Sequence, residues 1–128
     1  MDEGEIVARG RAAVGARFRP QGRSVEEGLD CIGLAALATG CAGVRRDYAL
    51  RGCDAGVVEE GLRSAGLVRV AEGQAGDVLL VRSGARQLHL LVLTGAGYLH
   101  ADARLRRVVE VPGAVPWPAV SAWRKEAR

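Results

Sequence analysis

Three residues of this sequence are of the types that carry out acyl transfer together: Cys31 and the two histidines of the chain, His89 and His100. Cys31 follows Asp30 directly and opens the apolar run CIGLAALAT. A cysteine attacks a carbonyl carbon as its thiolate, and a free thiol with a pKa of about 8.5 needs help to ionise. A helix N-terminus carries partial positive charge, so we expect this position to lower the pKa of Cys31.

The two histidines are candidates for the base. His89 lies in QLHLLVL, where alternation places it on one sheet face with Leu91 and Leu93. The short turn TGAG leads into the strand that carries His100, so a hairpin brings the two imidazoles together. We therefore expect a Cys–His–His arrangement in which one imidazole orients the other. Two alternatives stay open: His100 faces water at the strand end, and Asp102 is the orienting group.

The elements that must position these residues follow from the apolar pattern. Asp30 is a good N-cap for a fully buried helix, and Asp54 for an amphipathic one. The pattern predicts helices over residues 3–15, 31–39 and 54–66, a loop over 15–24, and strands over 77–82, 87–94, 95–101 and 106–112. We expect the tail from residue 116, with both tryptophans, to cover one end of the sheet. Helices followed by a small antiparallel sheet predict one α+β domain spanning residues 1–128.

Composition narrows the function classes. The net charge is +3, and the basic residues are scattered rather than interleaved with aromatics, which argues against a nucleic-acid partner. The N-terminus does not read as a secretory signal, and no run approaches the roughly 20 apolar residues of a membrane helix. We therefore expect synthesis in the cytoplasm, no membrane insertion, and export by another vehicle.

The three cysteines, Cys31, Cys41 and Cys53, are widely spaced and form no CxxC pair. A structural zinc site is therefore not expected, and we expect no metal or organic cofactor. A disulfide between two of the cysteines stays open. Cys41 and Cys53 are interpreted as structural thiols or chance.

The sequence resembles the NlpC family of papain-like cell-wall cysteine peptidases. The motifs LDCIGL, AGDVLLVR and HLLVLTGAGYLHA occur here in the family's order, over about residues 28 to 101. VGARFRPQG stands where the family has an aromatic and glycine-rich loop leading into the site. The compact form is most like the peptidases of phage tails and phage-derived gene transfer agents.

This resemblance implies a papain-like fold, with Cys31 as nucleophile, His89 as general base and acid, and His100 as the orienting third residue. It implies substrate contacts at Asp30 and Phe18. The implied substrate is the peptidoglycan stem peptide, at the bond between D-glutamate and diaminopimelate. The implied partners are structural proteins of a tail-like particle, which would deliver the enzyme to the periplasm or cell wall.

The sequence departs from the family pattern in three ways: Ile32 replaces the usual serine, Leu90 and Leu91 stand where glycine is common, and Phe18 replaces a tyrosine. The missing tyrosine hydroxyl makes an oxyanion site more dependent on backbone donors. Two other functions stay open. One is an amidase or acyltransferase on the same scaffold, and the other is a non-catalytic tail or binding component.

Overall fold

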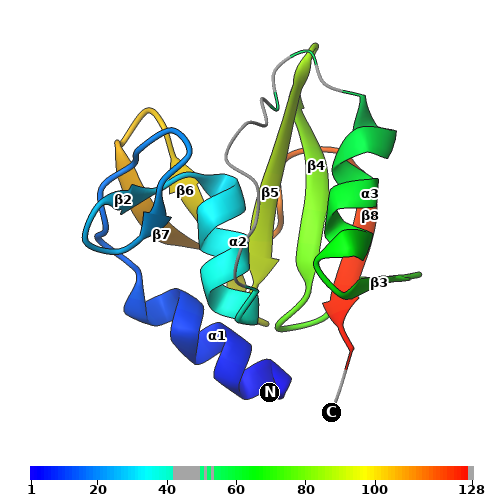
Figure 1. Ribbon diagram of the computed structural model, residues 1–128, viewed down its shortest axis with the longest axis horizontal. Helices are drawn as coiled ribbons and strands as arrows, with labels where there is room; N and C mark the ends of the chain where they lie inside the picture. The colour runs from blue at the N-terminus through cyan, green and yellow to red at the C-terminus, as the bar shows by residue number, and fades with distance from the viewer. Residues whose placement is uncertain (42–49, 51, 53, 127–128) are drawn as a thin grey trace.

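The computed structural model describes residues 1–41, 50, 52 and 54–126 (Figure 1). The helices are α1 (Glu3–Ala12), α2 (Cys31–Thr39) and α3 (Ala55–Ser64). The strands are β1 (Arg23–Ser24), β2 (Gly28–Leu29), β3 (Leu67–Val70), β4 (Val78–Gly84), β5 (Gln87–Leu93), β6 (Gly97–Asp102), β7 (Arg107–Pro112) and β8 (Ala119–Lys125). The predicted α+β class is confirmed.

Six of the strands form one antiparallel sheet in the order β3-β8-β4-β5-β6-β7. The predicted meander is its part from β4 to β7. The prediction for the tail was wrong, because residues 119–125 form β8, which lies between β3 and β4. Trp123 on β8 is fully buried and is the largest fully buried side chain, so its burial stabilises this strand in the sheet. The short strand β3 was also missed.

The sheet has two apolar faces. Helices α2 and α3 pack on one face, and α1 lies across its end (Figure 1). The main core between these layers contains Leu34, Leu80 and Leu90. A smaller cluster contains Leu91 and Tyr98 instead. Because side chains alternate along a strand, His89 projects from β5 on the side of Leu91, as the sequence predicts.

Helix α2 forms where the sequence predicts it. The Asp30 carboxylate accepts a hydrogen bond of 2.8 Å from the Gly33 N–H, and Gly40 ends the helix in the left-handed region at φ 71°. The other two helices begin after the capping residues Asp2 and Asp54. The first helix is shorter than predicted, because it ends at Ala12.

The segment predicted as a loop, residues 15–24, contains β-structure. Strands β1 and β2 pair, and Phe18 forms an isolated bridge with Leu29. A side chain on Gly33 would overlap the carbonyl oxygen of Gly22. Glycine at position 33 therefore lets this loop press against the start of α2, where Cys31 lies.

Candidate active site

Cys31 is the first residue of α2, and only 8% of it is exposed. Backbone groups of Leu90, Ile32 and Cys31 itself act to lower the pKa of its thiol, because they stabilise the thiolate. The nucleophile candidate thus reaches from the helix layer to strand β5, at the residue that follows His89.

An opening in the sheet exposes the Leu90 backbone to Cys31. Strands β5 and β6 pair at Val92–Leu99 and Leu93–Tyr98, near their shared turn. On its other side β6 pairs with β7 as far as Asp102. The two strands therefore part before they reach the two histidines, and the Leu90 backbone, which acts on the pKa of the Cys31 thiol, lacks a β6 partner.

The two histidines lie in contact across this opening. The Nε2 atom of His89 is 3.0 Å from the Nδ1 atom of His100, and the ring planes stand at 83°. The predicted pairing of the imidazoles is confirmed. His100 is only 6% exposed, so the alternative in which it faces water is wrong. The Asp102 Oδ2 atom lies 3.8 Å from the Nε2 atom of His100, in a position to face the charge of a protonated ring.

The structure does not join all three residues by direct bonds. Within the described part of the chain, no hydrogen bond links the Cys31 thiol to either imidazole; Leu90, whose backbone acts on the pKa of the thiol, directly follows His89. Catalytic hydrogen bonds are often long in a protein without substrate. Cys31 and the His89–His100 pair therefore form one candidate site in an open geometry.

Trp117 is the residue that the sequence analysis missed at this site. Its ring centroid lies 5.5 Å from that of His89 and 5.6 Å from that of His100. The Tyr98 ring lies 5.3 Å from that of His100. An aromatic wall therefore shields both imidazoles from water. No sequence signal points to it, because Trp117 stands between two prolines in a connection distant from both histidines.

Burial determines the protonation states of Cys31 and His89. Its effect, with a smaller contribution from the charge of Asp30, raises the pKa of Cys31 to about 12, although backbone groups of Leu90, Ile32 and Cys31 act to lower it. Burial, together with the His100 ring, lowers the pKa of His89 to about 4, although Asp102 acts in the opposite direction. The expectation that the helix N-terminus sets a low pKa for Cys31 was wrong, because desolvation outweighs the backbone bonds. At neutral pH the resting site holds a thiol and neutral imidazoles.

Asp30 and Phe18, the predicted substrate contacts, lie where the loop meets α2. The Asp30 carboxylate accepts hydrogen bonds from the Gly33 and Gln21 N–H groups and from the Arg23 guanidinium, at 2.7–2.9 Å. Both carboxylate oxygens are thus engaged within the protein, which favours a positioning role. Phe18 is half-buried against the main core.

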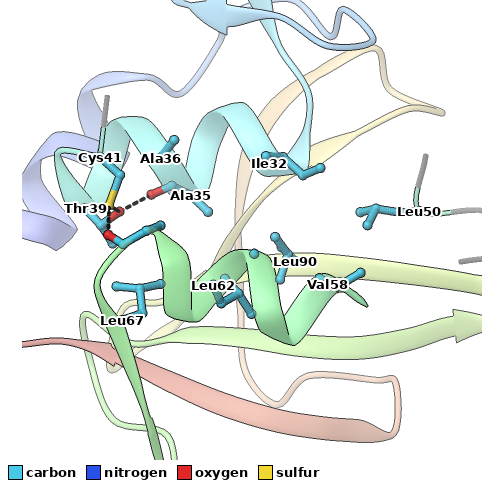
Figure 2. A pocket seen from close by; sticks show the side chains of 12 residues that line it. Ile32, Ala35, Ala36, Thr39, Cys41, Leu50, Val58, Leu62, Leu67 and Leu90 are labelled. Atoms are coloured by element: carbon cyan, nitrogen blue, oxygen red, sulfur yellow. Dashed lines mark hydrogen bonds between the residues drawn. The ribbon is translucent and has the colours of Figure 1, made fainter. Parts of the chain in front are cut away.

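An apolar cavity lies beside the site, between α2 and α3, with Ile32 and Leu90 in its wall (Figure 2). Its volume of about 40 Å³ has room for a few water molecules, so it does not hold a peptide side chain. Cys41 borders it and donates to the Ala65 carbonyl oxygen at 3.2 Å, which fits a structural thiol.

Cys31 and Cys41 are free thiols, and Cys53 lies outside the described residues. The described residues contain no group of three or more His, Cys, Asp or Glu side chains that could hold a metal ion. No helix among them is long and apolar enough to cross a membrane.

No family model matches the sequence, and no curated protein matches it. The fold is similar to the NlpC/p60 domain of the peptidoglycan hydrolase SagA, with TM-score 0.60, 22% identity, and coverage of 88% of this chain and 90% of that one. It is also similar to the P60 domain of an antigen from M. avium subspecies paratuberculosis, with TM-score 0.63, 17% identity, and coverage of 96% and 93%.

A third similar structure is NlpC2 from Trichomonas vaginalis, with TM-score 0.67 and 15% identity. The match covers 97% of this chain and 47% of that one, so this chain spans about half of NlpC2. All three likenesses extend over most of this chain. The fold is therefore the papain-like NlpC/p60 fold, as the sequence predicts.

Proposed function

We propose that this chain is an NlpC-type cysteine peptidase that hydrolyses amide bonds in peptidoglycan stem peptides, at the bond between D-glutamate and diaminopimelate. The observation that carries the proposal is the contacting His89–His100 pair at the sheet opening, next to Leu90, whose backbone acts on the pKa of the Cys31 thiol. The structural likeness to the NlpC/p60 domain of a peptidoglycan hydrolase supports the substrate class.

The histidine contact supports one proton path. It occupies Nε2 of His89 and leaves Nδ1 to accept the thiol proton. In that tautomer the Nε2–H of His89 donates to Nδ1 of His100, whose own Nε2–H faces the Asp102 carboxylate 3.8 Å away. His100 then holds the His89 ring in orientation, and Asp102 stabilises the positive charge that forms.

In the reaction, His89 takes the proton of Cys31 while the sulfur forms a bond to the amide carbonyl carbon. The Cys31 N–H at the start of α2 stabilises the developing oxyanion. The imidazolium of His89 then protonates the leaving amine as the C–N bond breaks, which leaves a thioester. Water, deprotonated by His89, attacks the thioester and regenerates the thiol.

The protonation state favours one second candidate, a non-catalytic component that keeps the fold. A thiol pKa near 12 beside an imidazole pKa near 4 describes a poorly reactive resting pair. Under the peptidase proposal, substrate binding completes the site and the proton moves as the sulfur attacks. An amidase or acyltransferase would use the same residues and differ in the acceptor.

We further propose the setting implied by the sequence resemblance: delivery to the cell wall by a phage tail or a gene transfer agent, with tail structural proteins as partners. Co-purification with such particles would test the setting separately from the chemistry. A chain found only outside particles would overturn it.

The test of the function is a digest of purified peptidoglycan with products identified by mass spectrometry. The wild type should release fragments with a new D-glutamyl or diaminopimelyl end, and Cys31→Ala should release none. Cys41→Ser is the matched control and should keep the activity, because it changes a thiol away from the histidines. Intact walls after incubation with the wild type, across several wall types, would overturn the peptidase proposal in favour of a non-catalytic component.

A further inference from the structure

Two segments distant in sequence bring five arginines together beside the histidine pair. They are exposed, and we call them the arginine surface: Arg17, Arg19, Arg104, Arg106 and Arg107. Arg17 and Arg107 are antiparallel bridge partners, and the Phe18 N–H donates to the Arg106 carbonyl oxygen at 2.9 Å. The loop that leads into α2 and the turn between β6 and β7 thus lie side by side (Figure 1).

The arginine surface works against folding in two ways. Like charges directly opposite each other across paired strands repel, and Arg17 stands opposite Arg107. Arg106 occupies the left-handed region at φ 64°, which an L-residue with a long side chain rarely adopts. Unfavourable features that gather at one place indicate a functional constraint there. A ligand of opposite charge would relieve the repulsion.

Among the described residues, the acidic groups of the same two segments form no ion pair with these arginines, although the charge of Arg104 helps to lower the pKa of Asp102 and the Arg17 Nε–H donates to the Glu27 carbonyl oxygen at 3.1 Å. The Glu27 carboxylate accepts from the Arg23 N–H, and the Asp102 carboxylate accepts from two backbone N–H groups of its own turn. Glu26 is exposed on the facing turn. In the described part of the chain, none of the five arginines has a carboxylate within ion-pair distance. The positive potential at this end of the molecule is therefore available to an anion.

The arginine surface adjoins the site. Asp102 faces His100 and starts the turn that carries Arg104, whereas Phe18 stands between Arg17 and Arg19. An anionic strand lying over the arginines would therefore continue toward the imidazoles. Guanidinium groups bind carboxylates through paired N–H donors, so a polymer with repeated carboxylates fits this surface better than a single small anion.

We propose that the arginine surface binds the free carboxylates of stem peptides that neighbour the scissile one on the same peptidoglycan strand. The choice of polymer rests on the proposed function. Arginines here hold the strand by charge, while cleavage takes place at the sheet opening. This makes the surface a site for the polymer rather than for the isolated stem peptide.

The test is co-sedimentation with insoluble peptidoglycan, in a Cys31→Ala background so that no turnover occurs. R104E/R107E should weaken binding about tenfold at low salt, and binding should fall as salt rises to about 0.15 M. The matched control, R82E/R86E, makes the same change of charge at two exposed arginines at the turn between β4 and β5 and should bind like its parent. R104Q/R107Q, expected to weaken binding less, serves if the reversed pair does not fold.

Competition identifies the ligand chemistry. Poly-glutamate should displace the protein from peptidoglycan, and a DNA oligonucleotide of equal charge should do so no better. Preferential displacement by DNA would overturn the proposal in favour of a nucleic-acid ligand. Equal binding by R104E/R107E and R82E/R86E would also overturn it.

The outcomes separate this inference from the proposed function. If the wild type binds through the arginine surface but does not cleave, the peptidase proposal is refuted and the binding proposal stands. If the wild type cleaves and its binding does not depend on the arginines, the peptidase proposal stands and the binding proposal is refuted. We compare the cleavage rate on peptidoglycan with the rate on a soluble single stem peptide. The ratio of these two rates should be about tenfold lower for R104E/R107E than for the wild type, because only the polymer spans the arginines.

Discussion

The resting thiol of Cys31 should be almost inert to alkylation at neutral pH. The experiment measures the rate of reaction with iodoacetamide as a function of pH. It uses a Cys41→Ser/Cys53→Ser background, which leaves Cys31 as the one thiol. Because only the thiolate reacts, the rate reports the ionised fraction. The same protein in denaturant supplies the reference for an accessible thiol.

The expected size follows from burial. A thiol with a pKa of about 12 is ionised to about 10⁻⁴ at pH 8, compared with a fraction on the order of 10⁻¹ for an unperturbed thiol. Alkylation of the folded protein should therefore be about a thousandfold slower than in denaturant, and still rising above pH 10. Limited access to a residue that is 8% exposed slows it further. His89→Ala should change the rate by no more than about twofold, since a neutral ring stabilises no thiolate.

A different profile would refute this reasoning. Fast alkylation that stays level from about pH 5 to 8, and that collapses in His89→Ala, is the signature of a thiolate–imidazolium pair. Desolvation would then not dominate at Cys31, and the helix N-terminus with the histidine pair would set the pKa, as the sequence alone suggests. The nucleophile would be charged before substrate arrives.

Three further outcomes are expected. With a folded pKa near 4, His89 contributes stability that is fully present above pH 6.5 and is lost as pH falls through 4. The loss amounts to about 3 kcal/mol of unfolding free energy. In urea unfolding, His89→Gln should lose correspondingly less stability than the wild type as the pH falls. Asp30→Ala should lower the unfolding free energy by about 1–2 kcal/mol and lower the thiol pKa of Cys31, whereas Asp30→Asn should retain most of the stability; urea midpoints and alkylation rates measure both. Trp117→Ala should reduce kcat about tenfold with little change in KM and raise the NMR pKa of His89, and Trp117→Phe should restore both; an unchanged histidine pKa would contradict shielding by the indole.

The sequence predicted the parts of the fold that local patterns determine. Asp30 and the apolar run after it define α2 to the residue, because a capping carboxylate and a fully buried helix leave clear signals. Alternation in β5 places His89 correctly, and a short turn brings His100 to it. These features depend on neighbours in sequence, so pattern and structure agree.

The missed features depend on contacts between distant segments. Strand β8 is stabilised by pairing with β3 and β4 and by the burial of Trp123, none of which its own short sequence reveals. The protonation of Cys31 was predicted in the wrong direction for the same reason. A helix N-terminus is visible in sequence, whereas the depth of burial that opposes it is not.

The site depends on the place where the sheet ceases to be continuous. Cys31 belongs to the core under the helices, whereas His89 contacts Trp117, which packs with the opposite cluster. A fully paired sheet would separate these layers by its backbone. Because β5 and β6 pair only near their turn, the gap lets the Leu90 backbone, one residue from the imidazole, act on the pKa of the thiol. Closing this gap by further pairing would engage the Leu90 backbone in the ladder and remove its effect on the thiol pKa, so the open register itself is part of the candidate site.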